Sequence, residues 1–210
     1  MSTSSSLKRP RRPENPHAMW RELCWVDHTL AVSGDLPSNR EQALEQLRMW
    51  EASGITDVFD MREERDDSDF IHENSQITCH WLGVDDNGSV RDDQWFEEIR
   101  DRAHELLTCS TIPRRILVHC HMGVNRGPSA LFAIMLTLGW DALEALRRIR
   151  DVRPIAGIIY APDAMRWWAR ELQYDDEAVE EKVNEVDAWL GRNELDLAYV
   201  IRSIGQRTAW

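Results

Sequence analysis

Residues 116–129 of this 210-residue chain read ILVHCHMGVNRGPS. The first three residues are wholly apolar, which is typical of a short buried strand in a parallel sheet. The strand leads directly to Cys120, and apolar residues from about position 128 to 138 predict a helix after the loop. This stretch therefore predicts a strand, a tight loop and a helix in immediate succession.

The loop after this strand has the features of an anion-binding site. Backbone N–H groups in such a loop, together with the dipole of the following helix, form a concave site for an anion. The same field, added to the cation of Arg126, favours a thiolate at Cys120. Arg126 carries a planar fork of donors that suits two phosphate oxygens, and Gly123 lets the backbone turn inward. The predicted phosphate-binding residues are His121, Met122, Gly123, Val124, Asn125, Arg126 and Gly127.

Helices and strands alternate along the rest of the chain. Strands are predicted over residues 25–32, 55–61 and 77–84, and amphipathic helices separate and follow them. Ser38 is predicted to cap the first helix, and the charged run over residues 62–69 is typical of a loop. The pattern predicts an α/β fold with a central, mostly parallel sheet of four to five strands and helices on both faces.

The composition is that of a globular protein with a strongly acidic balance. The hydrophobic fraction is 42% and the formal net charge is −12. No apolar run approaches the ~20 residues needed to span a bilayer, and the N-terminus lacks the apolar stretch of a secretory signal. These features predict a cytoplasmic protein that does not bind membranes. The acidic charge also disfavours general binding to nucleic acid.

The pattern of His119-Cys120, five residues and then Arg126 is the signature of the cysteine phosphatases. Its surroundings resemble the dual-specificity branch of the protein tyrosine phosphatase superfamily, over roughly residues 25–171. Asp86 lies on a loop ahead of an aromatic-led helix, where this family carries its general acid. The resemblance implies the cysteine-phosphatase fold and a phosphomonoester hydrolase that needs neither a metal nor another cofactor.

The resemblance also implies a role for each site residue. The Cys120 thiolate attacks the phosphorus of a phosphorylated protein and forms a phosphocysteine, while Arg126 and the loop amides hold the phosphate oxygens. Asp86 donates a proton to the leaving group and later takes one from water, with Asp85 as the alternative acid. His119 is expected to orient the loop and to support the thiolate through hydrogen bonds.

The chain departs from the family pattern directly after the loop. The family usually carries Ser or Thr at the next position, and that hydroxyl helps the cysteine to leave in the second step. Here the residue is Gly127, and Ser129 is the candidate substitute. We therefore expect hydrolysis of the phosphoenzyme to limit turnover.

The resemblance divides the chain into three parts. Residues 1–18 are predicted to be a disordered basic tail, residues 19–174 a dual-specificity-like phosphatase domain, and residues 175–210 an acidic helical extension. Within the second part, Arg153-Pro154 resembles the Arg-Pro pair that precedes the last helix of the family's domain.

Two other functions stay open at this point. The run over residues 123–126 is similar to the Gly-x-Asn-Arg of the cysteine-dependent RNA triphosphatases, which makes an RNA or nucleotide 5′-phosphatase the first alternative. Gly127 makes a catalytically weak phosphate-binding module the second. No metal site is predicted, because His119 and His121 point in diverging directions. Arg62 follows a predicted strand and is a candidate substrate contact.

Overall fold

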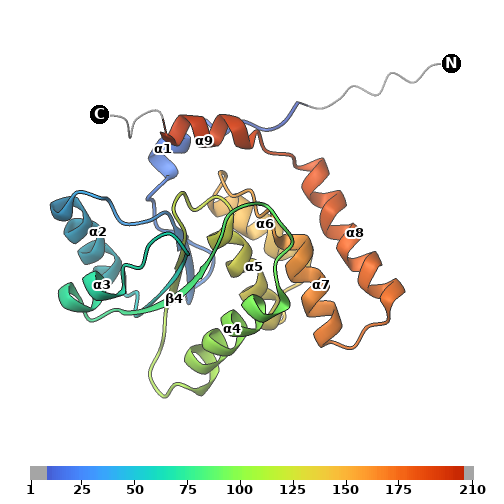
Figure 1. Ribbon diagram of the computed structural model, residues 1–210, viewed down its shortest axis with the longest axis horizontal. Helices are drawn as coiled ribbons and strands as arrows, with labels where there is room; N and C mark the ends of the chain where they lie inside the picture. Colours follow the sequence, from blue (N-terminus) through green and yellow to red (C-terminus); the bar gives the residue numbers. More distant parts are fainter. Residues whose placement is uncertain (1–8, 206–210) are drawn as a thin grey trace.

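The computed structural model describes residues 9–205, which are arranged around a five-stranded sheet with the strand order β1-β2-β5-β3-β4 (Figure 1). The strands are β1 (Cys24–Trp25), β2 (Leu30–Ser33), β3 (Asp57–Arg62), β4 (Thr78–Val84) and β5 (Ile116–His119). The helices are α1 (Pro16–Met19), α2 (Arg40–Ala52), α3 (Ser68–Asn74), α4 (Asp93–His104), the π-helical turn η1 (Glu105–Cys109), α5 (Arg126–Thr137), α6 (Ala142–Val152), α7 (Ala161–Glu171), α8 (Asp176–Arg192) and α9 (Leu197–Gly205).

The sheet is parallel except at one edge. β2, β5, β3 and β4 pair in parallel, and the two-residue β1 pairs with β2 in the antiparallel direction. Side chains of the central strands alternate between the two faces, as in β5, where Ile116 and Val118 enter one apolar cluster and Leu117 enters another. The predicted α/β fold with a mostly parallel sheet is confirmed.

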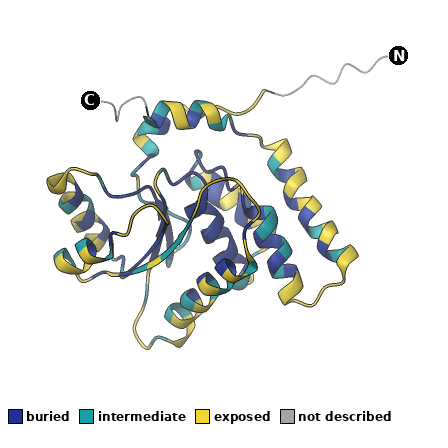
Figure 2. Cartoon of the chain, viewed as in Figure 1, coloured by how far each residue is buried: buried dark blue, intermediate teal, exposed yellow. Residues whose placement is uncertain are grey.

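Helices cover both faces of the sheet. α2 and α3 pack on one face, and α4 to α8 lie on the other (Figure 1). α5 is buried over nearly its whole length, because it lies between the sheet and α4, α6 and α7 (Figure 2). Since parallel strands end at the same edge of the sheet, β5 delivers its loop to that edge at the N-terminus of α5.

Three local predictions differ from the structure. Residues 25–32 form a hairpin and not one strand, because Oδ1 of Asp27 accepts hydrogen bonds from the backbone N–H groups of Thr29 and Leu30 and turns the chain. The side-chain cap of α2 is Asn39 rather than Ser38. The charged run predicted to be a loop contains the start of the short helix α3.

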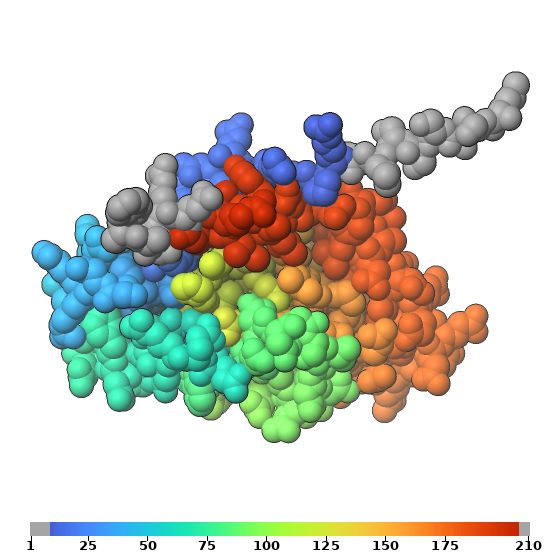
Figure 3. Space-filling view, turned by 45° about the horizontal axis from the view of Figure 1, so that its top comes forward, coloured from blue at the N-terminus to red at the C-terminus, as the bar shows by residue number. Residues whose placement is uncertain are grey.

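Both terminal segments pack against each other. The backbone of Arg11 donates to the carbonyl oxygen of Glu194 (2.8 Å) and accepts from the N–H of Asp196 (3.0 Å). α1 lies against α9, and the space-filling view shows the N- and C-terminal segments side by side along one edge (Figure 3). The structure thus differs from the predicted tail over residues 9–18, while residues 1–8 lie outside the described residues. α8 and α9 lie in the predicted helical extension.

No helix within residues 9–205 combines the length and the apolar character that crossing a membrane requires.

Candidate active site

The loop from Cys120 to Arg126 is held from outside by donors to its carbonyl oxygens. The fully buried guanidinium of Arg153 donates to the carbonyl oxygens of Met122 (3.1 Å) and Gly123 (2.6 Å). Two more carbonyls accept hydrogen bonds in the same way, that of His121 from Nε1 of Trp20 (2.8 Å) and that of Val124 from the N–H of Gly157 (2.6 Å). The Arg153-Pro154 pair is thus linked to the loop through the arginine.

The N–H groups of the same peptides point the other way. The N–H and C=O of a trans peptide are antiparallel, and no described peptide bond is cis. The N–H groups of residues 122–125 therefore face the concave side of the loop, where they form an anion cradle with the N-terminus of α5. Gly123 has a φ of +61°, and a Cβ there would collide with Arg153 and with the carbonyl oxygen of Ser33. Glycine is required at this position.

A cavity of about 290 Å³ lies over this cradle. It brings together Cys120, Arg126 and Asp86, which are far apart in the sequence. The rest of its lining is His121, Met122, Val124, Asn125, Ile159, Leu197 and Ile201. Leu197 and Ile201 belong to α9, so the C-terminal extension forms part of the wall.

The guanidinium of Arg126 lies between two carboxylates. Nη1 and Nη2 donate to the two carboxylate oxygens of Glu64 (2.6 and 2.8 Å), and Nη1 also donates to the carbonyl oxygen of Val84 (3.0 Å). Nε makes no hydrogen bond within the described residues, but it lies 3.3 Å from Oδ2 of Asp86. A phosphate that uses the side-on edge formed by Nε and the second N–H of Nη2 therefore displaces the Asp86 carboxylate from Nε.

Glu64 is a positioning residue that the sequence analysis missed. The hydrogen bonds from Arg126 lower the pKa of Glu64 to about 2, so the carboxylate stays ionised at any ordinary assay pH. Its side chain is about half exposed (54%), so its repulsion of a bound phosphate is screened by water. Its main effect is to hold the guanidinium of Arg126 in one orientation.

Replacing Glu64 with glutamine is expected to reduce kcat/KM for an aryl phosphate by about ten-fold. Glutamine replaces one of the two acceptor oxygens with an NH₂ group, which cannot accept from a guanidinium N–H, so the two parallel hydrogen bonds that orient Arg126 are lost. Steady-state kinetics between pH 5 and 8 test this, with Glu63→Gln as a control that carries the same charge change one residue away. Faster turnover in Glu64→Gln would show instead that Glu64 obstructs phosphate binding.

Asp86 lies at the cavity, and Asp85 does not line it. Oδ1 of Asp86 accepts hydrogen bonds from Nδ2 of Asn125 (2.7 Å) and from the hydroxyl of Tyr160 (3.1 Å), and Oδ2 lies 3.3 Å from Nε of Arg126. Burial raises the pKa of Tyr160, so its hydroxyl remains protonated and able to donate. The carboxyl of Asp86 is therefore fixed by three neighbours, one of which is Nε of Arg126.

Ser129 and His119 do not make the predicted contacts with the nucleophile. The hydroxyl of Ser129 donates to Oδ1 of Asn125 (3.2 Å) and accepts from the N–H of Tyr160 (3.2 Å), so it orders the residues around Asp86. His119 is fully buried, and neither ring nitrogen makes a hydrogen bond within the described residues. Burial lowers the pKa of His119, which keeps the ring neutral.

Arg62 and Gly127 do not line the cavity. Arg62 is buried and forms ion pairs with Asp60 (2.7 Å) and Asp67 (2.6 Å), so the hypothesis that it contacts substrate fails. A Cβ on Gly127 would lie 3.2 Å from the backbone nitrogen of Cys120. That position is tight, because backbone atoms of His119 would also lie 3.2 and 3.3 Å from the added Cβ.

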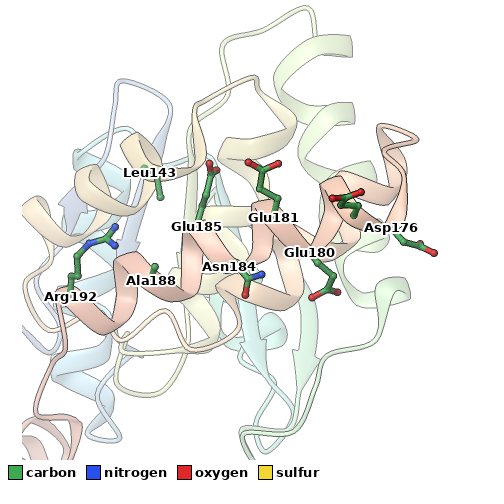
Figure 4. A pocket seen from close by; sticks show the side chains of 9 residues that line it. Leu143, Asp176, Glu180, Glu181, Asn184, Glu185, Ala188 and Arg192 are labelled. Atoms are coloured by element: carbon green, nitrogen blue, oxygen red, sulfur yellow. The ribbon is translucent and has the colours of Figure 1, made fainter.

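A larger hollow of about 840 Å³ lies along α8 and is not a candidate for the same chemistry. Its lining includes five carboxylates, from Asp176, Glu177, Glu180, Glu181 and Glu185, together with Leu143 of α6 (Figure 4). These charges would repel a phosphate. Among residues 9–205 there is also no group of three or more His, Cys, Asp or Glu side chains that could hold a metal ion.

Comparison with known proteins identifies the fold. No protein-family model matches the chain, and no curated protein sequence matches it. The phosphatase domain of Yvh1 from Chaetomium thermophilum matches with a TM-score of 0.56 and 21% identity, over 74% of this chain and 100% of that chain. Tk-PTP in its active form matches with 0.53 and 19%, over 81% and 99%. PTPMT1 in complex with PI(5)P matches with 0.53 and 17%, over 80% and 97%. The chain thus has the predicted fold of the cysteine-based phosphatases.

Proposed function

We propose that this protein, which has the fold of the cysteine-based phosphatases, is a metal-independent phosphomonoester hydrolase that works through a phosphocysteine. One observation carries the proposal. A single cavity is lined by Cys120, Arg126 and the carboxyl of Asp86, and its floor is the inward-facing N–H groups of residues 122–125.

The geometry supports a displacement in two steps. In the first, Sγ of Cys120 attacks the phosphorus, the bond from phosphorus to the leaving oxygen breaks, and protonated Asp86 gives its proton to that oxygen. In the second, water attacks the phosphorus, the P–S bond breaks and Asp86 takes a proton from the water. Because two donors already occupy Oδ1 of Asp86, Oδ2 is the oxygen that carries the proton.

The walls of the cavity favour an aromatic leaving group. Apolar side chains line it from the loop, from the segment before α7 and from α9: Met122, Val124, Ile159, Leu197 and Ile201. Such a wall suits a phenyl ring better than a short alkyl group. We therefore infer that phosphotyrosine in proteins is the preferred substrate class.

The alternatives have less support from the cavity. Among residues 9–205, Arg126 is the only Arg or Lys that lines it, so a triphosphate-ended RNA or an inositol ring with further phosphates would leave most of its charge unpaired there. PTPMT1 was solved with PI(5)P, but at 17% identity that ligand is not transferred to this chain. Cytoplasmic location stays a prediction from composition.

A panel of substrates in the presence of EDTA tests the proposed function. Phenyl phosphate and a phosphotyrosine peptide are expected to be hydrolysed, with kcat/KM at least about ten-fold above that of a phosphoserine peptide. Release of phosphate from triphosphate-ended RNA but not from the aryl esters would favour the RNA enzyme. Binding of vanadate without turnover of any substrate would favour the binding module.

Gly127 is expected to make the second chemical step slow. With no side-chain hydroxyl at position 127, the wild-type protein should release a burst of phenol equal to the enzyme concentration and then turn over more slowly. Gly127→Ser should shrink the burst, because its hydroxyl helps the thiolate to leave. Gly127→Ala carries the same steric cost, since its Cβ also lies 3.2 Å from the nitrogen of Cys120, and should not shrink it. Stopped-flow kinetics measure all three; a wild type without a burst contradicts the expectation.

A further inference from the structure

A separate cavity of about 190 Å³ lies where the N-terminal segment meets the end of α8. Its lining is Arg9, Arg11, Arg150, Gly191, Arg192, Asn193 and Glu194. Four arginines thus face one carboxylate, in a chain whose net charge is −12. None of the four arginines forms an ion pair with any residue in the range 9–205.

Arg9 and Arg11 are brought to this cavity by the pairing of the two terminal segments. Arg11 forms a β-bridge with Leu195, which fixes the local backbone in an extended form. Side chains two residues apart on an extended segment point to the same side, so the side chain of Arg9 lies on the same side as that of Arg11. Arg12 points to the other side, where it pairs with Asp196 (2.8 Å).

Arg150 is the buried member of the group. Only 4% of the residue is exposed, its Nη1 donates to the carbonyl oxygen of Asn193 (3.0 Å), and its Nε has no hydrogen-bond partner among the described residues. Burial, and then the charge of Arg11, lower the pKa of Arg150 to about 10. The C-terminal end of α8 supplies about half a negative charge, which is too little to balance a net lining charge of three positives.

We propose that this cavity is a second phosphate-binding site, in which Arg11, Arg150 and Arg192 bind a phosphate group through their guanidinium forks. A phosphate supplies the two negative charges and the several acceptors that these arginines lack.

The position of the cavity relates it to the active site. A cavity of about 270 Å³ lies between the two. It shares Arg150 and Glu194 with the arginine cavity, and Ile159 and Leu197 with the cavity that holds Cys120. The phosphate could therefore come from free phosphate or pyrophosphate, or be a second phosphate on the substrate, in which case the inference rests on the proposed function.

Calorimetric titration with inorganic pyrophosphate tests the site itself. In an Arg126→Ala background, which removes the active-site cation, pyrophosphate is expected to bind with a stoichiometry of one. Adding Arg11→Gln should weaken binding by about ten-fold or more, whereas adding Arg12→Gln, the adjacent arginine on the other side, should not. Equal affinities in these two variants, or no binding to Arg126→Ala, would overturn the proposal.

The wild-type background gives an independent reading that does not depend on the folding of Arg126→Ala. With inorganic phosphate as the ligand, wild type and Arg12→Gln should bind two ions, one of them at the active site, and Arg11→Gln one; two in Arg11→Gln would overturn the proposal. These titrations need no turnover, so their failure is distinct from failure of the proposed function.

A phosphotyrosine peptide with and without a second phosphate then identifies the source of the bound phosphate. A lower KM for the doubly phosphorylated peptide in wild type but not in Arg11→Gln assigns the site to substrate, and equal KM values assign it to a free anion.

Discussion

Replacing Cys120 with serine is expected to reduce kcat for phenyl phosphate by about 10³-fold or more, because a serine hydroxyl is a far weaker nucleophile than a cysteine sulfur. The cradle is built from backbone N–H groups and Arg126, and none of these is changed by the substitution. Competitive inhibition by inorganic phosphate should therefore remain within a few-fold of the wild-type value. The variant should therefore bind phosphate but fail to hydrolyse phenyl phosphate.

Two measurements check this result. Steady-state kinetics give kcat and the inhibition constant, and rapid quenching followed by intact-protein mass spectrometry detects the phosphoenzyme in wild type and not in the variant. Cys109→Ser is the control, since Cys109 is an exposed free cysteine away from the cavity. Turnover by Cys120→Ser close to the wild-type rate would rule out Cys120 as the nucleophile.

Replacing Asp86 with asparagine is expected to slow phenyl phosphate hydrolysis by about 10²- to 10⁴-fold, the usual contribution of a general acid. The asparagine keeps the shape and can still accept from Asn125 and Tyr160, but it has no proton to give. The loss should be smaller for 4-nitrophenyl phosphate, whose leaving group needs less protonation.

The matched control for this prediction is Asp85→Asn. It makes the same charge change one residue earlier, outside the lining of the cavity, and should change kcat by less than about two-fold. A large loss in Asp85→Asn with little change in Asp86→Asn would transfer the acid role to Asp85. Equal losses with both phenyl esters would show that residue 86 does not protonate the leaving group.

The sequence predicts best what is encoded locally. β5, the loop and α5 follow one another without a break, so their apolar pattern and the Cys120 to Arg126 spacing are readable in one short stretch. The mostly parallel sheet follows from the alternation of helices and strands. The hairpin of β1 and β2 is predicted as one strand, because residues 25–32 alternate enough to suit a strand and Asp27 gives only a weak turn signal.

The parts of the site that were missed depend on contacts between distant residues. Glu64 lies in a charged run that is typical of a solvated loop, and its partner Arg126 is 62 residues away. Tyr160 contacts Asp86 across 74 residues. Leu197 and Ile201 belong to an amphipathic helix whose apolar face is compatible with packing anywhere. A local sequence pattern does not predict which distant residue such a side chain contacts.

Arg153 has a consequence for how the protein reaches its active form. Its guanidinium donates to carbonyl oxygens at Met19, Trp20 and Glu22 as well as to the loop, across as many as 134 residues. Contacts of such long sequence separation carry a large loop-closure entropy and tend to form late in folding. During refolding, a collapsed chain with its sheet and α5 in place would still lack a shaped cradle. Recovery of phosphate binding should then lag behind recovery of secondary structure.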